Sequence, residues 1–227
     1  MNNSHIPNGP YEKFFKRPFD ILCALAAIAV FWWLYIIIGI LVKIKLGSPV
    51  IFKQERPGKD GKIFKLYKFR SMSDAKDKNG ELLPDSERLT EFGRILRATS
   101  LDELPEAFNI LRGDMSVVGP RPLAVKYLPY YSENENRRHD VRPGLSGLAQ
   151  IHGRNCLNWE ERFAYDTEYV DNITFIGDVK IILSTVLKAV KRDGVAVRGS
   201  TKTVDFDIYR KNQLEHPKSE TIIKTST

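Results

Sequence analysis

The chain has 227 residues, which suits one ordinary domain with extensions better than several domains. Charged residues make up 28% and hydrophobic residues 42%, which excludes a disordered acidic chain, a collagen-like repeat and a polytopic membrane protein. The formal net charge of +7 favours a phosphate-bearing partner or an anionic membrane surface, without deciding between them. The two cysteines, Cys23 and Cys156, provide no disulfide framework, as expected in a reducing cytoplasm.

The first predicted element is an apolar helix over residues 21–42, a stretch without Asp, Glu, Lys, Arg or His. At about 1.5 Å per residue it would be about 33 Å long, enough for the hydrocarbon core of a bilayer. The stretch is longer than the apolar part of a signal peptide, and no A-x-A cleavage site follows it. We therefore expect a retained membrane helix; the alternative is a buried helix of a soluble domain.

Positive charges flank this helix at both ends: Lys13, Lys16 and Arg17 precede it, and Lys43, Lys45, Lys53 and Arg56 follow it. A spanning helix carries its positive excess on one side, so this distribution favours a helix that re-enters the same leaflet. The midpoint, Trp32-Trp33, contains no helix breaker. Its indole N–H groups could pair with carbonyls freed by a bend, or both rings could pack along a straight helix.

A β-hairpin is predicted next, because residues 50–54 and 62–69 alternate apolar and polar side chains around an Arg-Pro-Gly-Lys-Asp-Gly turn. Two helices follow, over residues 88–98 and 100–111. The apolar face of the first comprises Leu89, Phe92, Ile95 and Leu96. A third, amphipathic helix around residues 179–190 lies either in the membrane interface or over the core of the domain itself.

Together these elements predict an α+β fold that is mainly helical. We expect an N-terminal cytoplasmic segment (residues 1–20), a membrane-inserted and re-entrant helix (21–42), a cytoplasmic catalytic domain with interfacial amphipathic helices (43–200) and a mobile polar tail (201–227).

The densest group of chemically capable residues is the adjacent carboxylate pair Asp102 and Glu103, with Arg97 five positions earlier. Near a helix start, such a group could bind phosphate, and one carboxylate could act as a nucleophile or hold Mg²⁺. The same letters also fit a purely structural role. Ser100 and Glu103 have the spacing of a capping box, which would only begin a helix.

Two further groups contain rigidly placed or clustered cations. Arg121 lies between Pro120 and Pro122, which could present its guanidinium to a phosphate or could form an ordinary surface loop. Basic residues and glycines over 137–150 could approach a nucleotide, although a surface loop would look similar. The four histidines show no zinc-ligand spacing, and neither a P-loop nor a dinucleotide-binding fingerprint occurs.

Four motifs in this order resemble those of the bacterial sugar transferases called monotopic phosphoglycosyl transferases: KFRSM (68–72), SLDELP (100–105), GDMSVVGPRP (113–122) and RPGLSGLAQIHGRN (142–155). The resemblance covers about residues 15–194. Within the family, NGELLP (79–84) and RHDVRPG (138–144) are most similar to the small members that act on UDP-N,N′-diacetylbacillosamine.

The resemblance implies transfer of a sugar-1-phosphate from a UDP-sugar to undecaprenyl phosphate, with release of UMP and with Mg²⁺ as cofactor. The partners would be these two substrates and membrane lipid, not nucleic acid, at the cytoplasmic face of the bacterial inner membrane. Asp102 matches the family nucleophile and a metal-binding position, and Glu103 matches its partner carboxylate. The positions expected at substrate are Lys68, Arg97, Arg121, Arg142 and Gln150, and Asp114 is a further motif position.

The sequence departs from the family pattern at the middle of the apolar helix. Family members usually carry a Ser-Pro pair there, which breaks the helix so that it returns to the same leaflet, whereas this chain has Trp32-Trp33. We expect re-entry to persist with a weaker or displaced bend. Two other functions fit parts of the sequence: a membrane-tethered module that binds polyanions, which accounts for the charge alone, and an inactive assembly scaffold. The sequence does not predict the oligomeric state.

Overall fold

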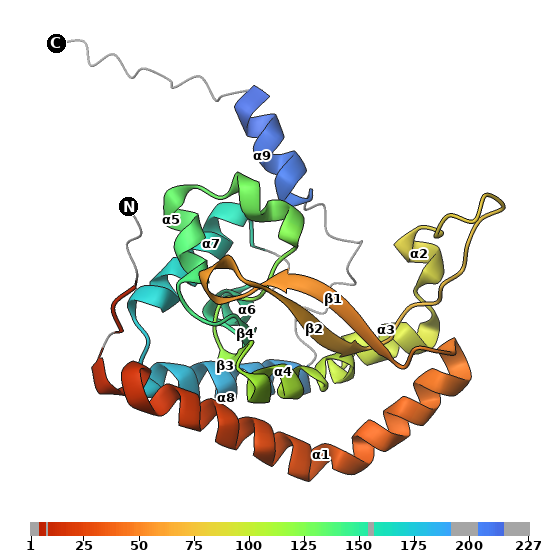
Figure 1. Cartoon of the computed structure of the whole chain (residues 1–227), viewed down its shortest axis with the longest axis horizontal. Helices are drawn as coiled ribbons and strands as arrows, with labels where there is room; N and C mark the ends of the chain where they lie inside the picture. Colours follow the sequence, from red (N-terminus) through yellow and green to blue (C-terminus); the bar gives the residue numbers. More distant parts are fainter. Residues whose placement is uncertain (1–4, 8, 154–156, 192–203, 216–227) are drawn as a thin grey trace.

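The computed structural model describes residues 5–7, 9–153, 157–191 and 204–215 (Figure 1). Three parts of the predictions lie outside the described residues. They are Cys156, residues 154–155 of the 142–155 motif, and residues 201–203 and 216–227 of the expected tail. The helices are α1 (Lys16–Leu46), α2 (Asp85–Arg88), α3 (Glu91–Ala98), α4 (Glu106–Arg112), α5 (Glu133–Asn136), α6 (Leu148–His152), α7 (Trp159–Asp171), α8 (Phe175–Lys191) and α9 (Phe206–Glu215). The strands are β1 (Ile51–Pro57), β2 (Ile63–Phe69), β3 (Ser116–Val118) and β4 (Gly144–Ser146). This mainly helical fold with small sheets confirms the predicted class.

The long apolar helix is α1, which continues a single π-helical turn, η1 (Tyr11–Phe15). Together they form a helix over residues 11–46 that is long and apolar enough to cross a membrane. Figure 1 shows α1 along one edge of the molecule with a bend near its middle. The Trp33 indole donates a hydrogen bond to the carbonyl of Val30, at 3.1 Å, so one of the two indoles pairs with a backbone carbonyl as the sequence suggested.

The first half of α1 is docked on the rest of the chain by polar contacts. Lys16 Nζ lies 2.6 Å from the Asp178 carboxylate of α8, and it also donates to the carbonyl of Val118. Asp20 is buried and accepts hydrogen bonds from the Ser116 hydroxyl, at 2.8 Å, and from the amide of Val117. Because these groups are all paired, they hold α1 against β3 and α8 despite their burial.

The predicted β-hairpin is present. β1 and β2 pair antiparallel, with Ile51 opposite Phe69 and Pro57 opposite Ile63. The first strand runs three residues further than expected, so the turn contains only Gly58 to Lys62. Asp60 adopts a positive φ of 56° in this turn. Alternation along β2 sends Leu66 and Lys68 to one face and Tyr67 and Phe69 to the other.

The helix expected over residues 88–98 is interrupted. Leu89 is extended, and α3 begins only after Thr90, whose side chain accepts a hydrogen bond from the amide of Gly93. Leu96 is buried, but Ile95 is 56% exposed, so the apolar face is narrower than predicted. The helix expected over residues 100–111 is also divided, into a 3-10 turn, η3 (Leu101–Glu103), and α4.

Two of the sequence motifs meet at a parallel strand pair. β3, in the 113–122 motif, pairs with β4, in the 142–155 motif. The backbones approach so closely that a Cβ on Gly119 would lie 2.4 Å from the carbonyl oxygen of Arg142. Glycine is therefore required there, and the glycines of both motifs have a packing role.

The C-terminal part of the described chain forms two helices. The amphipathic helix α8 covers the core with Ile181 and leaves Phe175, Ile176, Leu183, Val186 and Leu187 at least half exposed, so both predicted roles of this helix fit its surface. The expectation of a mobile tail is wrong for residues 206–215, which form α9. Phe206 is fully buried among Leu123, Tyr127, Trp159 and Phe163.

Candidate active site

The turn that carries Asp102 and Glu103 is not a helix cap. Ser100 adopts a left-handed conformation, with φ 56°, and its side chain makes no capping hydrogen bond. The Glu103 carboxylate instead contacts Lys68 Nζ, at 2.7 Å, and the guanidinium of Arg121. The capping-box role is therefore not realised, because Ser100 makes no capping hydrogen bond and the Glu103 carboxylate contacts Lys68 and Arg121 instead.

Lys68 and Arg121 converge on a group of three carboxylates. Lys68 reaches this group from β2, because its side chain points to the face opposite Tyr67 and Phe69. Its Nζ also lies 3.1 Å from Glu106 Oε1, and Glu106 is only 2% exposed. Glu103 thus accepts from two cations that are 35 and 18 positions away in the sequence.

Asp102 differs from its neighbours in having no fixed partner. It is 6% exposed, yet no hydrogen bond or ion pair within the described residues holds its carboxylate. Burial, followed by the negative charge of Glu103, raises the pKa of Asp102 to about 6, against the opposing charges of Lys68, Arg97 and Arg121. Asp102 is therefore mostly ionised at neutral pH and free to react.

The pKa values of Glu103 and Glu106 are shifted in opposite directions. Burial opposes ionisation of Glu103, but the charges of Arg121 and Lys68 outweigh it and lower the pKa of that carboxyl. Burial and the charge of Glu103 raise the pKa of Glu106 to about 7. Glu103 thus remains an anion, whereas Glu106 can hold or release a proton near neutral pH.

Arg97 is held at the edge of this group by the hairpin motif. Its Nε donates to the Ser71 hydroxyl at 2.9 Å. The backbone of Ser71 in turn packs on α3, where a Cβ on Gly93 would lie 1.8 Å from the Ser71 carbonyl oxygen. The supporting roles of Ser71 and Gly93 were not predicted, because they depend on α3 packing against the chain after β2.

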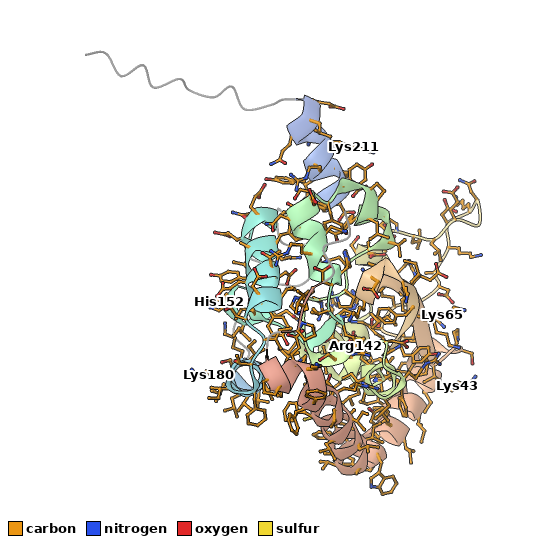
Figure 2. The ribbon with its side chains drawn as sticks, turned by 60° about the vertical axis from the view of Figure 1, so that its left-hand side comes forward. Lys43, Lys65, Arg142, His152, Lys180 and Lys211 are labelled. Carbon is orange, nitrogen blue, oxygen red and sulfur yellow. The ribbon has the colours of Figure 1, made fainter. Side chains whose placement is uncertain are left out.

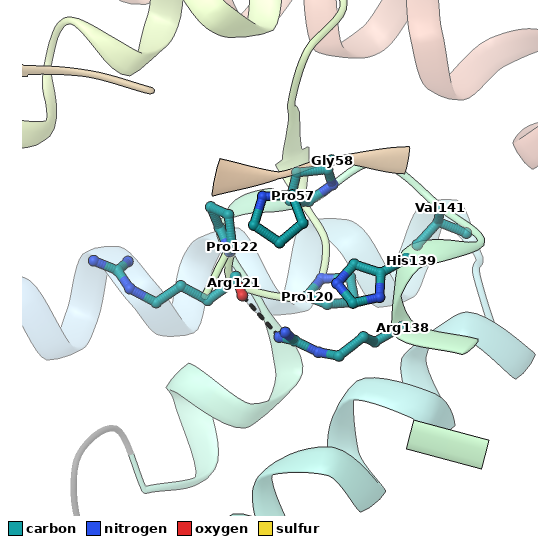
Figure 3. Close-up of a pocket in the computed structure, with 9 residues that line it drawn as sticks. Pro57, Gly58, Pro120, Arg121, Pro122, Arg138, His139 and Val141 are labelled. Atoms are coloured by element: carbon teal, nitrogen blue, oxygen red, sulfur yellow. Dashed lines mark hydrogen bonds between the residues drawn. The ribbon is translucent and has the colours of Figure 1, made fainter. Parts of the chain in front are cut away.

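The backbone of Arg121 is held by the buried ion pair between Arg138 and Asp166, and its side chain extends to Glu103. Figure 3 shows the Arg138 side chain reaching the carbonyl of Arg121, while the side chain of Arg121 points away from Arg138 and His139. Arg138 donates to that carbonyl at 2.7 Å and to Asp166 at 2.8 and 3.0 Å. Arg138 and Asp166 are 3% and 2% exposed, so the predicted rigid presentation of Arg121 has a definite support.

Two other expected substrate residues contact backbone instead. Arg142 lies among the loops near the centre of the molecule (Figure 2) and donates through Nε to the carbonyl of Gly113, at 2.9 Å. Gln150 donates to the carbonyl of Leu145. Within the described residues, neither side chain makes a hydrogen bond or ion pair with Asp102 or Glu103. Their contact with substrate stays a prediction.

Asn109 is a positioning residue that sequence reasoning missed. Its side chain accepts from the amide of Tyr67, at 2.9 Å, and donates to the carbonyl of Lys65, at 2.8 Å. These bonds fix β2 against α4 and therefore Lys68 against Glu106. The sequence contained a signal, because Glu106 and Asn109 share one face of the predicted helix at a spacing of three residues.

The donor set fits a magnesium ion that is bound mainly by substrate. Among the described residues, no three His, Cys, Asp or Glu side chains are grouped to hold a metal. Glu103 and Glu106 already contact Lys68, which leaves Asp102 as the available carboxylate. Mg²⁺ is commonly bound by one or two carboxylates together with substrate phosphates. The site as a whole thus combines a free carboxylate, a proton-carrying group and several cations, as reactions at a phosphate require.

The sequence of this chain is similar to those of known sugar transferases. The bacterial sugar transferase family profile matches residues 11–192. The uncharacterized sugar transferase EpsL of Bacillus subtilis is 49% identical over 180 residues, which are 79% of this chain and 89% of that protein. The undecaprenyl-phosphate galactose phosphotransferase of Salmonella typhimurium is 37% identical over 200 residues, 81% of this chain and 42% of that protein.

A third relative is the UDP-glucose:undecaprenyl-phosphate glucose-1-phosphate transferase of Klebsiella pneumoniae, which is 41% identical over 192 residues, 80% of this chain and 41% of that protein. The chain therefore spans less than half the length of two of these relatives and most of the length of the first. The profile match and the identities show that this chain is an enzyme of the bacterial sugar transferase family.

Proposed function

We propose that this protein transfers a sugar-1-phosphate from a UDP-sugar to undecaprenyl phosphate and releases UMP, as the first membrane step of glycoconjugate assembly. The observation that carries this proposal is the buried Asp102 carboxylate, which has no fixed partner among the residues that the structure describes and lies beside a glutamate paired with two cations. The substrates named for the Salmonella and Klebsiella relatives support the same class of reaction.

The reaction would proceed through two displacements at one phosphorus atom. An oxygen of Asp102 attacks the phosphorus that bears the sugar, the bond to the UMP oxygen breaks, and UMP leaves. The phosphate oxygen of undecaprenyl phosphate then attacks the same phosphorus and displaces the Asp102 carboxylate. Two steps of this kind avoid a simultaneous meeting of three partners.

An anionic nucleophile that approaches a pyrophosphate is repelled by its negative charge, and the cations of the site would offset this repulsion. Arg97 and Arg121 would stabilise charge on the phosphoryl oxygens, and Lys68 would keep Glu103 ionised and in place. Asp102 is the side chain that would hold Mg²⁺, and the ion would supply further neutralisation of the phosphate charge. Glu106, with its raised pKa, would exchange a proton with the departing or entering phosphate.

The membrane arrangement follows from the lipid substrate. A lipid phosphate lies at the interface, so the site must be held at the same depth. We propose that α1 enters and leaves the cytoplasmic leaflet of the inner membrane, supported by the cations at both ends and by the bend in Figure 1. A single cysteine introduced at Ser4, after replacement of Cys23 and Cys156, should be labelled only after the cell membrane is permeabilised. Labelling from outside intact cells would contradict re-entry.

The experiment that tests the transfer reaction is UMP release by detergent-purified protein with undecaprenyl phosphate and Mg²⁺. The donor panel includes UDP-N,N′-diacetylbacillosamine, which the sequence motifs favour, and UDP-galactose and UDP-glucose. We expect turnover on one donor, which is lost in Asp102→Asn and retained in Asp85→Asn, a matched change at an exposed carboxylate. Absence of UMP from every donor, with folding confirmed, would favour the polyanion-binding or scaffold function.

A further inference from the structure

An open, mainly apolar groove of about 790 Å³ lies on the face of the hairpin opposite Lys68. One side is formed by Tyr35 and Gly39 of α1, and the other by Phe108 and Leu111 of α4. Phe69 of β2 contributes to the wall between them. Phe108 and Leu111 lie on the side of α4 away from Glu106 and Asn109, and the groove touches the SLDELP segment only at Pro105, so none of the candidate catalytic side chains lines it.

The groove is continuous with the surface that α1 presents to the membrane. Ile36 and Ile40, which neighbour its α1 residues in sequence, are 53% and 54% exposed. Phe108, inside the groove, is 43% exposed. An apolar surface of this extent, joined to a membrane helix, is suited to a hydrocarbon chain rather than to a water-soluble ligand.

One end of the groove is cationic. Lys53 and Arg112 both lie over the Tyr67 ring, 5.7 and 5.9 Å from its centroid, and Arg112 donates to the Tyr67 hydroxyl at 3.1 Å. Arg112 is 3.5 Å from Asp114, whereas Lys53 forms no ion pair within the described part of the chain. Two cations and the one carboxylate of Asp114 leave a net positive charge at the mouth of the apolar groove. Figure 2 shows that the hairpin, labelled at Lys65, and the end of α1, labelled at Lys43, form the same side of the molecule.

The position of these cations argues against the reacting lipid phosphate as the occupant. Arg112 is the last residue of α4 and Pro105 precedes its first, so a phosphate on Arg112 lies about 10 Å along the helix from the Asp102 turn. A phosphate held there could not reach the Asp102 carboxylate. The charge and the apolar lining instead suit a membrane lipid that stays bound while the enzyme works.

We propose that the groove binds one anionic phospholipid, whose acyl chain lies between α1, the hairpin and α4 and whose phosphate contacts Lys53, Arg112 and the Tyr67 hydroxyl. The lipid would pack on the outer face of α4, whose inner face carries Glu106 and Asn109. This proposal does not rest on the transferase function, because the site contains none of the catalytic side chains and lipid binding requires neither substrate.

The test is native mass spectrometry of the delipidated full chain after addition of phosphatidylglycerol or of phosphatidylcholine with the same acyl chains. We expect one phosphatidylglycerol to be retained in preference to phosphatidylcholine. Lys53→Gln and Arg112→Gln should each weaken retention about fivefold, as expected for the loss of one cation near an anionic headgroup. Lys62→Gln, at an exposed lysine of the same hairpin, should leave retention unchanged.

A second pair of variants tests the apolar part of the groove. A Cβ on Gly39 would meet only Val50, at 3.8 Å, so Gly39→Leu fits the helix but fills the groove. It should abolish retention, whereas Ala26→Leu on the exposed face of α1 should not. Circular dichroism and thermal unfolding establish that each variant is folded. Equal retention of both lipids, or retention of phosphatidylglycerol unchanged in the groove variants, would overturn the proposal. Selective retention of undecaprenyl phosphate, lost in these variants, would also overturn it.

Discussion

The buried ion pair between Arg138 and Asp166 provides a quantitative test of how Arg121 is supported. Asp166→Asn keeps the side-chain volume but leaves the Arg138 charge buried without its partner. Removal of one member of a buried pair costs about 3–5 kcal/mol, and we expect the lower value because the Asn carbonyl can still accept one hydrogen bond. For a chain of this size, a loss of about 3 kcal/mol lowers the apparent Tm by roughly 6–12 °C.

Arg138→Met should be at least as destabilising. It leaves the Asp166 carboxylate buried and removes the donor from the carbonyl of Arg121 and from the Tyr131 hydroxyl. The double variant should be no less stable than Arg138→Met alone, because neither charge remains. The coupling energy between the two sites is then about 3 kcal/mol.

The assay is denaturant or thermal unfolding of all four proteins in one detergent, with transferase activity measured at a temperature where each is folded. Activity should stay low in both proteins that lack Arg138, because the Arg121 carbonyl has lost its donor. A double variant whose loss of stability equals the sum of the single losses would refute the ion-pair argument. Full activity without Arg138 would refute its role in positioning Arg121.

Three further predictions concern neighbouring parts of the site. Gly93→Ala places a Cβ 1.8 Å from the Ser71 carbonyl oxygen and should displace the hydroxyl that holds Arg97, which lowers kcat/KM on the order of 10²-fold; unchanged kinetics would contradict this. Burial and the charge of Arg138 lower the pKa of His139 from 6.5 to about 4, so the unfolded chain takes up this proton first and stability falls by about 3 kcal/mol as the pH drops from 6.5 to 4. His139→Gln should remove this part of the slope in unfolding experiments. The pKa of Glu106 is raised from 4.5 to about 7, so its contribution to stability is full below pH 4.5 and is lost as the pH rises through 7. Glu106→Gln, which mimics the protonated form, should therefore be more stable than the wild type by up to about 3 kcal/mol at pH 8 but less active; lower stability at that pH would contradict the direction of the shift.

Local patterns in the sequence predicted those elements whose formation depends on their own residues. The uncharged run of residues 21–42 and the alternation around the Arg-Pro-Gly-Lys-Asp-Gly turn required a long apolar helix and a hairpin wherever they lie in the fold. The α9 helix could not be predicted in this way. Its one large buried residue, Phe206, stands in a polar stretch and is buried only because Trp159 and Tyr127 are brought to it by other elements.

The roles of single site residues also depend on distant parts of the chain and could not be predicted from local sequence alone. Ser100 and Glu103 match a capping box as well as they match a catalytic turn, and local spacing cannot decide between them. The difference comes from Lys68 and Arg121, which reach Glu103 from distant positions and hold its carboxylate, while Ser100 makes no capping hydrogen bond. Asp166 gave no signal at all, because its importance depends on a partner 28 positions away.

The most direct test of the account is intact-protein and peptide mass spectrometry after mixing the enzyme with its UDP-sugar and Mg²⁺ in the absence of undecaprenyl phosphate. We predict a mass increase of one phosphosugar, located on the peptide that contains Asp102, absent from Asp102→Asn and removed when undecaprenyl phosphate is added. Turnover without any such adduct, or turnover that survives in Asp102→Asn, would contradict the assignment of Asp102 as the nucleophile.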